Sequence, residues 1–238
     1  MEIKLSNRLK KVASFLPKGA IFADIGSDHA YLPCYVCLSD DTARAIAGEV
    51  KVGPLQSAKE TVESLQLTHK VDVRLGNGLE VIQKKDGIEQ IVIAGMGGSL
   101  INTILEKGQQ QLQSVNRIIA QPNIDARTLR KCFGRLQFQI TDEAILEENG
   151  HIYEIIVADR KADSYLPTLS EKELLFGPIL LKERSTPFYD KWHQEKQKYD
   201  YILRQLKNAK YPDKNKTSEF EKERKWIEEV LSNVKRST

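Results

Sequence analysis

Short apolar runs and amphipathic segments alternate along the first 133 residues, and this alternation constrains the fold more than any other feature. Apolar runs typical of buried strands lie at residues 20–25, 43–49, 90–95 and 117–121, and residues 70–76 alternate between apolar and polar like a strand. Segments with helical spacing lie at 6–16, 31–38, 53–65, 99–105 and 124–133. Five alternating units predict a parallel β-sheet covered by helices on both faces.

The next segment breaks this pattern. Residues 138–159 contain two β-rich runs on either side of Asn149-Gly150, the dipeptide most typical of a tight hairpin turn. An antiparallel hairpin would make the sheet mixed but mostly parallel. We therefore expect an α/β fold with a mixed, mostly parallel sheet.

A helical tail follows the expected sheet. Residues 162–170 resemble a linker, and 171–183 are helical with a break at Gly177-Pro178. Two charged helical runs, 187–209 and 217–235, are separated by the sequence YPDKN. Apolar and aromatic residues recur every seven positions in these two runs, at Trp192, Tyr199 and Leu206 and at Phe220, Ile227 and Val234. This spacing predicts a helical hairpin of coiled-coil type, so we expect two domains, 1–160 and 161–238.

Composition and charge narrow the class of protein. No apolar run approaches the roughly 18 residues of a membrane span, and the N-terminus lacks the apolar core of a signal peptide. Three cysteines are too few for a disulfide framework. These features predict a soluble, cytoplasmic protein without membrane contact, and we expect a monomer. Residues 161–238 carry 17 lysines and arginines against 13 acidic residues. This excess would suit a polyanion such as nucleic acid, but on charge alone it is more typical of ordinary solvated helix faces.

The loops that follow the strands are expected to share one edge of the sheet. Parallel strands with right-handed crossovers place their carboxyl ends, where ligands bind, on the same side. The candidate site therefore comprises residues 26–31, 49–50, 76–79, 95–98 and 121–123.

The first of these loops, in the stretch FADIGSDHAYLP, favours a cationic ligand. A dinucleotide fingerprint has three glycines around a pyrophosphate, whereas here Gly26 stands between Asp24 and Asp28. Two carboxylates would repel a pyrophosphate but suit the sulfonium and ammonium groups of S-adenosylmethionine. Glu49, at the end of the second strand, suits ribose hydroxyls, in this cofactor or in NAD.

The remaining loops supply close backbone approach and amide groups. Gly76-Asn77-Gly78 offers small residues and an amide for an adenine edge, and three glycines surround Met96 before the next helix. That loop lacks the G-K-[ST] of a phosphate loop. Gln121-Pro122-Asn123 offers side-chain amides that can both donate and accept hydrogen bonds at a base edge.

These motifs together resemble one family. FADIGSDHAYLP, IAGE, GNGLE, IAGMGG and QPN, in this order, closely resemble the bacterial tRNA adenine-22 N1-methyltransferases, and the resemblance covers the whole chain. It implies a class I, Rossmann-like methyltransferase domain with a helical C-terminal domain, S-adenosylmethionine as cofactor and tRNA as substrate. The first loop departs from the general class I pattern D/E-x-G-x-G-x-G, since Asp28 and Ala30 stand where glycines are usual.

The resemblance and the loop chemistry together give a set of expected site residues. The cofactor is expected to contact Asp24, Gly26, Asp28, Tyr31, Glu49, Val50, Asn77, Gly78, Leu79, Ala94, Gly95 and Met96. The methyl-transfer pocket is expected to be shaped by Asp28, His29 and Asn123. The tRNA is expected to contact Arg8, Lys11, Gln121, Asn123, Arg127 and Arg130.

Other interpretations remain open at this point. The chain could methylate a small molecule or a protein, or it could be a noncatalytic RNA-binding protein built on a methyltransferase fold. Cys34-Tyr-Val-Cys37 has the C-x-x-C spacing of redox and zinc motifs, but no second pair exists, and we expect buried cysteines. The four histidines are scattered, so we expect no metal site.

Overall fold

The computed structural model describes residues 3–161, 167–209, 211 and 213–232. It forms two compact units, Met1–Ile179 and Leu180–Thr238, which are considered separately below. The division lies after the predicted boundary at residue 160, because Arg130 binds residues 174 and 175 to the first unit.

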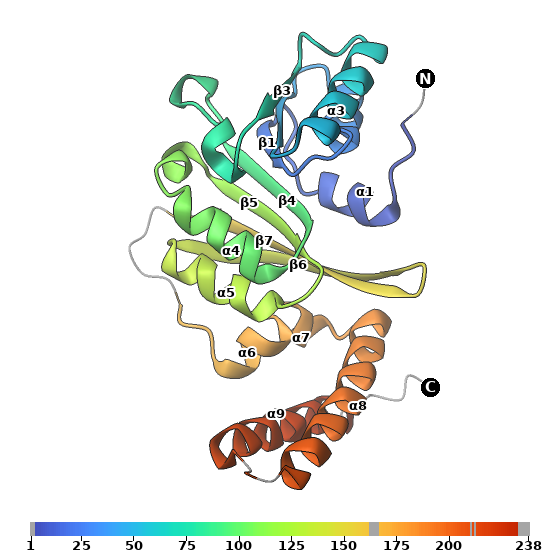
Figure 1. Cartoon of the computed structure of the whole chain (residues 1–238), viewed down its shortest axis with the longest axis vertical. Coiled ribbons are helices and arrows are strands. Elements are labelled where there is room, and N and C mark those ends of the chain that lie inside the picture. Colours follow the sequence, from blue (N-terminus) through green and yellow to red (C-terminus); the bar gives the residue numbers. More distant parts are fainter. Residues whose placement is uncertain (1–2, 162–166, 210, 212, 233–238) are drawn as a thin grey trace. The chain divides into compact units, whose positions relative to one another are not determined.

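The described residues of the first unit form a seven-stranded sheet (Figure 1). Its strands are β1 (Ile21–Ile25), β2 (Arg44–Glu49), β3 (Val71–Leu75), β4 (Gln90–Met96), β5 (Arg117–Pro122), β6 (Phe138–Glu148) and β7 (His151–Arg160). They lie in the order β3-β2-β1-β4-β5-β7-β6. The first five are parallel, and β7 runs antiparallel to both β5 and β6. The mixed, mostly parallel sheet and the hairpin at Asn149-Gly150 are confirmed.

Helices cover both faces of this sheet (Figure 1). One face packs against α1 (Asn7–Ala13), α2 (Tyr31–Ser39) and α3 (Val52–Ser64), and the other against α4 (Gly98–Lys107) and α5 (Ala126–Arg135). The central strands are therefore apolar on both sides: Ile91 and Ile93 belong to the core under α4 and α5, and Val92 to the core on the opposite face. This burial on both faces explains why the runs read as continuously apolar rather than alternating.

The strand order places a reversal point at β1. This strand pairs with β2 on one side and with β4 on the other. The chain therefore builds one half of the sheet from β1 through β2 to β3 and then returns to build the other half from β4. Ligands of open α/β sheets bind outside the carboxyl ends of the strands at such a point. The predicted site loops follow β1, β2, β3, β4 and β5 at this edge.

A buried charge cluster fastens α6 (Glu171–Phe176) to the first unit. The side chain of Arg130 is fully buried; its Nε donates to Oε1 of Glu143 at 2.8 Å, and a terminal nitrogen lies 3.5 Å from Glu154. Another terminal nitrogen donates to the carbonyl oxygens of Leu174 and Leu175, both at 3.3 Å. Because α5, the hairpin and α6 share this arginine, α6 belongs with the sheet, and the unit extends past residue 160.

The second unit is a helical hairpin. It contains α7 (Leu180–Glu183), α8 (Thr186–Asn208) and α9 (Lys214–Ser232), and α8 packs along α9. Trp192, Leu203, Ile227 and Val230 are buried in this unit, whereas Tyr199, Leu206 and Phe220 of the predicted heptads are partly buried. Val234, also predicted there, lies outside the described residues. Among the helices that the structure describes, none combines the length and the apolar character needed to cross a membrane.

Candidate active site

The turn after β1 is built on three left-handed residues. Gly26, Asp28 and Ala30 have φ angles of 72°, 59° and 56°. These are the three positions at which the general D/E-x-G-x-G-x-G pattern has glycine, which adopts such angles without strain. Asp28 and Ala30 thus adopt left-handed angles that are strained for residues other than glycine. Hydrogen bonds from the amides of Gly26 and Ser27 to the carbonyl oxygen of Gly48 (2.9 and 3.2 Å) hold the turn against β2.

Two buried carboxylates meet at this turn. Asp24 is buried near the end of β1, and its Oδ2 accepts a hydrogen bond from the Ser27 hydroxyl at 2.6 Å. Glu49, buried at the end of β2, accepts a hydrogen bond from the backbone amide of Asp28. Burial raises the pKa of Asp24 to about 7, and the nearby charge of Glu49 adds to the rise. A cation bound here would favour the ionised form of Asp24.

The exposed part of the turn carries aromatic surface. The rings of His29 and Tyr31 stack with centroids 5.1 Å apart and an interplanar angle of 14°. His29 Nε2 lies 3.7 Å from Oδ2 of Asp28, whose side chain is 72% exposed. Asp28, His29 and Tyr31 are therefore accessible to a ligand at the sheet edge, as an active-site role requires.

The third loop leads into a short 3-10 helix, Gly78–Val81. Glu80 accepts a hydrogen bond from the amide of Asn77 at 3.3 Å. Leu79 is buried, whereas Asn77 and, after β2, Val50 are exposed. Val50 and Asn77 can thus be reached by a ligand, whereas Leu79 can offer only its backbone.

The fourth loop begins with a β-bulge at Gly95. The β4–β5 register passes from Ala94↔Gln121 to Met96↔Pro122, which leaves Gly95 without a strand partner. Side chains of the QPN motif take its two backbone groups: its amide donates to Oε1 of Gln121 at 3.1 Å, and its carbonyl oxygen accepts from the Asn123 amide at 2.8 Å. Gln121 also donates to Oδ1 of Asn123 at 3.3 Å.

This arrangement corrects the prediction for Gln121. Its side chain is fully buried, so it supports the Gly95 bulge instead of facing a base. Asn123 is exposed and remains available to the substrate. Met96 covers Gly26 so closely that a Cβ atom at Gly26 would overlap the Met96 methyl group. Ala94, Gly95 and Met96 thus line the same edge as the acidic turn.

The three arginines predicted to contact tRNA are engaged within the first unit. Arg130 is buried in the charge cluster, so the prediction that it binds phosphate was wrong; the sequence could not show that two acids of the hairpin would surround it. Arg127 forms an ion pair with Glu171, which offsets its charge. The guanidinium of Arg8 donates to Oε1 of Gln121. Lys11 is exposed, with its ammonium 4.7 Å from the Phe15 ring centroid.

The cysteines behave as core residues. Cys34, Cys37 and Cys132 are buried and unbridged, and burial raises the pKa of Cys34 to about 12 and that of Cys37 to about 11. Such thiols are unreactive at neutral pH. Within the described ranges of the chain, no group of three or more potential ligands is placed to hold a metal ion.

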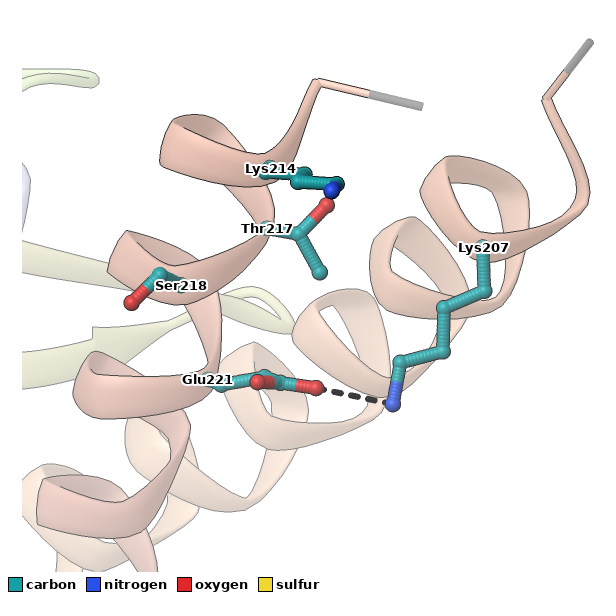
Figure 2. Close-up of a pocket in the computed structure, with 5 residues that line it drawn as sticks. All are labelled: Lys207, Lys214, Thr217, Ser218 and Glu221. Carbon is teal, nitrogen blue, oxygen red and sulfur yellow. Dashed lines mark ion pairs between the residues drawn. The ribbon is translucent and has the colours of Figure 1, made fainter. Parts of the chain in front are cut away.

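A separate pocket lies in the second unit. It has a volume of about 340 Å³ and is lined by Lys207, Lys214, Thr217, Ser218 and Glu221 (Figure 2). Lys207 and Glu221 face one another from α8 and α9 and form an ion pair at 2.8 Å. The pocket includes none of the predicted site residues.

Several contributors to the site carry no signal in the sequence. Ser27, which binds Asp24, is an ordinary turn residue. Ile124, 72% exposed directly after Asn123, reads as part of a helix. Glu148 and Tyr153 contact Arg8 and its helix from the distant hairpin. Only pairing across the fold brings these last two residues near the site.

Solved structures share this architecture. The Streptococcus pneumoniae protein Sp1610, solved in complex with S-adenosyl-L-methionine, is 42% identical, with a TM-score of 0.86 over 96% of this chain and 100% of that chain. Mycoplasma capricolum TrmK, solved with S-adenosyl-homocysteine, is 28% identical, with a TM-score of 0.83 over 96% of this chain and 98% of that chain. Fold and site together define the class of Rossmann-like methyltransferases.

The sequence comparison narrows this class. Residues 22–234 match the family described as TrmK, tRNA (adenine(22)-N(1))-methyltransferase. The tRNA (adenine(22)-N(1))-methyltransferase of Bacillus subtilis strain 168 is 46% identical over 218 residues, which cover 90% of this chain and 91% of the relative. The chain belongs to the tRNA (adenine(22)-N(1))-methyltransferase family, as its loop motifs predicted.

Proposed function

We propose that the protein transfers the methyl group of S-adenosylmethionine to N1 of adenine 22 in tRNA. The observation that carries this proposal is the convergence of Asp24 and Glu49, both buried, around the glycine turn at the reversal point of the sheet. A buried carboxylate is costly to keep ionised unless a positive charge pairs with it. A ligand with cationic and hydroxyl groups is such a partner, and relatives of this chain bind one.

The residues present fit this cofactor. Asp24 is placed to attract its ammonium group, and Glu49 to accept hydrogen bonds from the ribose hydroxyls. Val50 and the segment 77–79 are placed to flank the adenine, and Tyr31 to pack on the exposed side of the ligand. Gly26 and the segment 94–96 leave space for the backbone to approach. When bound, S-adenosylmethionine supplies the electrophilic methyl group.

The protein's own contribution to the transfer is alignment and charge stabilisation. N1 of adenine has a lone pair, so the attack itself needs no general base, and the product base carries a positive charge. Asn123, fixed by its hydrogen bond to Gly95, is placed to orient the adenine. Asp28 and His29 shape the pocket, and the carboxylates near it stabilise the developing cation.

Contacts to tRNA are expected to come from the exposed lysines of the N-terminal segment and from the helical unit. Lys4, Lys10 and Lys11 are exposed. Residues 180–238 carry 15 lysines and arginines against 10 acidic residues. Such contacts would position the RNA without reading its sequence. The target base must leave its stack or already lie outside it. A monomer acting in the cytoplasm, where tRNA is modified, suits this role.

The test is methylation of one defined site. Purified protein is incubated with labelled S-adenosylmethionine and an unmodified tRNA transcript, and with the same transcript carrying guanine at position 22. N1-methyladenosine, detected by nucleoside mass spectrometry in the first transcript and absent from the second, is the expected result. Cofactor binding without label in either RNA would overturn the proposal and favour a small-molecule or protein substrate.

A further inference from the structure

The bulge at Gly95 is held by side chains instead of by strand pairing. Pro122, the next residue of β5, has no N–H to donate, and Gly95 itself has a φ of 80°. Both backbone groups of Gly95 therefore depend on Gln121 and Asn123. Backbone hydrogen bonds from Asn123 to Met96 (2.8 Å) and from Gly98 to Ile124 (2.9 Å) hold the residues that follow, so the Gln121 and Asn123 side chains fix Gly95 itself.

Arg8 fixes the side chain of Gln121 from outside the sheet. Its guanidinium donates to the same Oε1 atom that accepts the Gly95 amide, and it lies 5.1 Å from the ring centroid of Tyr153 on β7. Glu148, at the end of β6, accepts from the amides of Asn7 (2.6 Å) and Arg8 (3.2 Å), which anchors the start of α1. Arg8 is therefore held both at its backbone and at its guanidinium. The guanidinium and the Gly95 amide both donate to Oε1 of Gln121, whose side chain is fully buried.

We infer that Arg8 is a positioning residue: it orients Gln121, which holds Gly95 and Asn123 in place for methyl transfer. This role differs from the phosphate contact that its charge suggested. One terminal nitrogen of the guanidinium donates to Gln121, and the group lies against the Tyr153 ring, so its position is set from within the first unit. The inference rests on the proposed function for its kinetic readout, but the effect on the loop is independent of catalysis.

The experiment compares Arg8→Gln, Arg8→Lys and Lys11→Gln in the full-length protein. Four quantities are measured: the single-turnover rate at saturating tRNA, the Kd for tRNA as a function of salt, the Kd for S-adenosylmethionine, and amide hydrogen exchange of residues 94–97. Lys11→Gln removes the same charge from the same helix without touching Gln121, so it reports the effect of a lost phosphate contact.

Both Arg8 variants are expected to reduce the single-turnover rate about ten- to a hundredfold, the effect of losing one charge-assisted hydrogen bond that sets geometry. Exchange at Gly95 is expected to accelerate, while the slope of log Kd against log salt stays at the wild-type value. Lys11→Gln is expected to lower that slope by about one and to leave Gly95 exchange unchanged. Arg8→Gln combined with Gln121→Ala should be no slower than the slower single variant, because both act through one contact.

The inference is overturned if Arg8→Gln lowers the salt slope by about one while rate and Gly95 exchange stay at wild-type values, or if Arg8→Lys restores the full rate. If Arg8→Gln fails to fold, the charge-retaining Arg8→Lys variant decides the outcome. If the wild-type protein does not methylate tRNA, the proposed function fails, and Gly95 exchange still tests the role of Arg8.

Discussion

At the scale of single residues, the first turn shows how one backbone path accepts different sequences. Asp28 and Ala30 adopt the left-handed angles that glycines adopt elsewhere. The hydrogen bond from the Asp28 amide to Glu49 stabilises this conformation, because it gives the buried Glu49 carboxylate a donor. Strain of this kind concentrates at functional sites. The acid-rich turn is thus a variant of the glycine turn with extra negative charge.

The raised pKa of Asp24 predicts a pH-dependent cofactor affinity. Asp24 has a pKa of about 7 in the free protein, so below pH 7 the carboxyl is mostly protonated and must lose its proton to pair with a cation. Affinity should therefore weaken by up to tenfold per pH unit below 7, with release of a proton on binding. Calorimetry between pH 5.5 and 7.5, in buffers of different ionisation enthalpy, measures both effects. Asp24→Asn should bind more weakly and independently of pH; wild-type affinity that stays constant over this range would contradict the prediction.

Asn123 gives a second prediction at this scale. Asn123→Ala removes the exposed amide that holds the Gly95 carbonyl and that we propose orients the substrate, so we expect a single-turnover rate at least about tenfold lower, with cofactor affinity little changed. Asn116→Ala, an exposed asparagine just before the opposite end of β5, is the matched control. A wild-type rate for Asn123→Ala would exclude Asn123 from the reaction.

At the scale of secondary-structure elements, the start of α4 depends on close backbone contact. The amide of Gly98 donates to the carbonyl oxygen of Ile124 at 2.9 Å, and a Cβ atom at Gly98 would overlap the carbonyl of Asp125. α4 and α5 can therefore pack together only if position 98 has no side chain. This contact also sets where Asn123, just before α5, meets the loop that precedes α4.

Two glycine substitutions should consequently have opposite signs. Gly98→Ala is expected to lower the free energy of unfolding by about 2–4 kcal/mol, because the obstructing atoms are backbone and cannot rotate away. Gly53→Ala, in the first turn of α3 where nothing lies within 4 Å of the added atom, should raise it by about 0.5–1 kcal/mol. Urea unfolding of the two variants measures both free energies, and a change of the same sign and size in the two would contradict the packing argument.

At the scale of the whole molecule, the buried cluster around Arg130 determines where the first unit ends. Besides its bonds to α6, the cluster reaches Ile179, whose amide donates to Oε2 of Glu143 at 2.9 Å. Burial raises the pKa of Glu143, although Arg130 opposes the rise. Removing α6 would leave these buried charges without several of their partners, a costly change in a dry environment.

A truncation series tests this boundary. A fragment of residues 1–179 should fold and bind S-adenosylmethionine like the full chain. A fragment of residues 1–160 should be less stable by at least about 3 kcal/mol, from the lost hydrogen bonds to charged groups and the lost burial of Leu174. Urea unfolding of the two fragments provides the comparison, and equal midpoints would place the boundary at 160. Loss of the basic helical unit should weaken tRNA binding in both fragments.

The sequence by itself determined the elements and the edge of the sheet that carries the site. Strand and helix periods are local properties, and parallel topology then brings Asp24, Glu49, Gly95 and Asn123 to one edge without further information. The fate of individual charges was decided only by the tertiary structure. In the sequence Arg130 looks like an ordinary cation on a helix surface. In the structure it is buried, because the hairpin of β6 and β7 places Glu143 and Glu154 beside α5. Arg8 and Gln121, 113 residues apart, form one contact for the same reason. Periodicity reports which face of an element is apolar, whereas the partner of a polar side chain depends on which distant elements pack beside it.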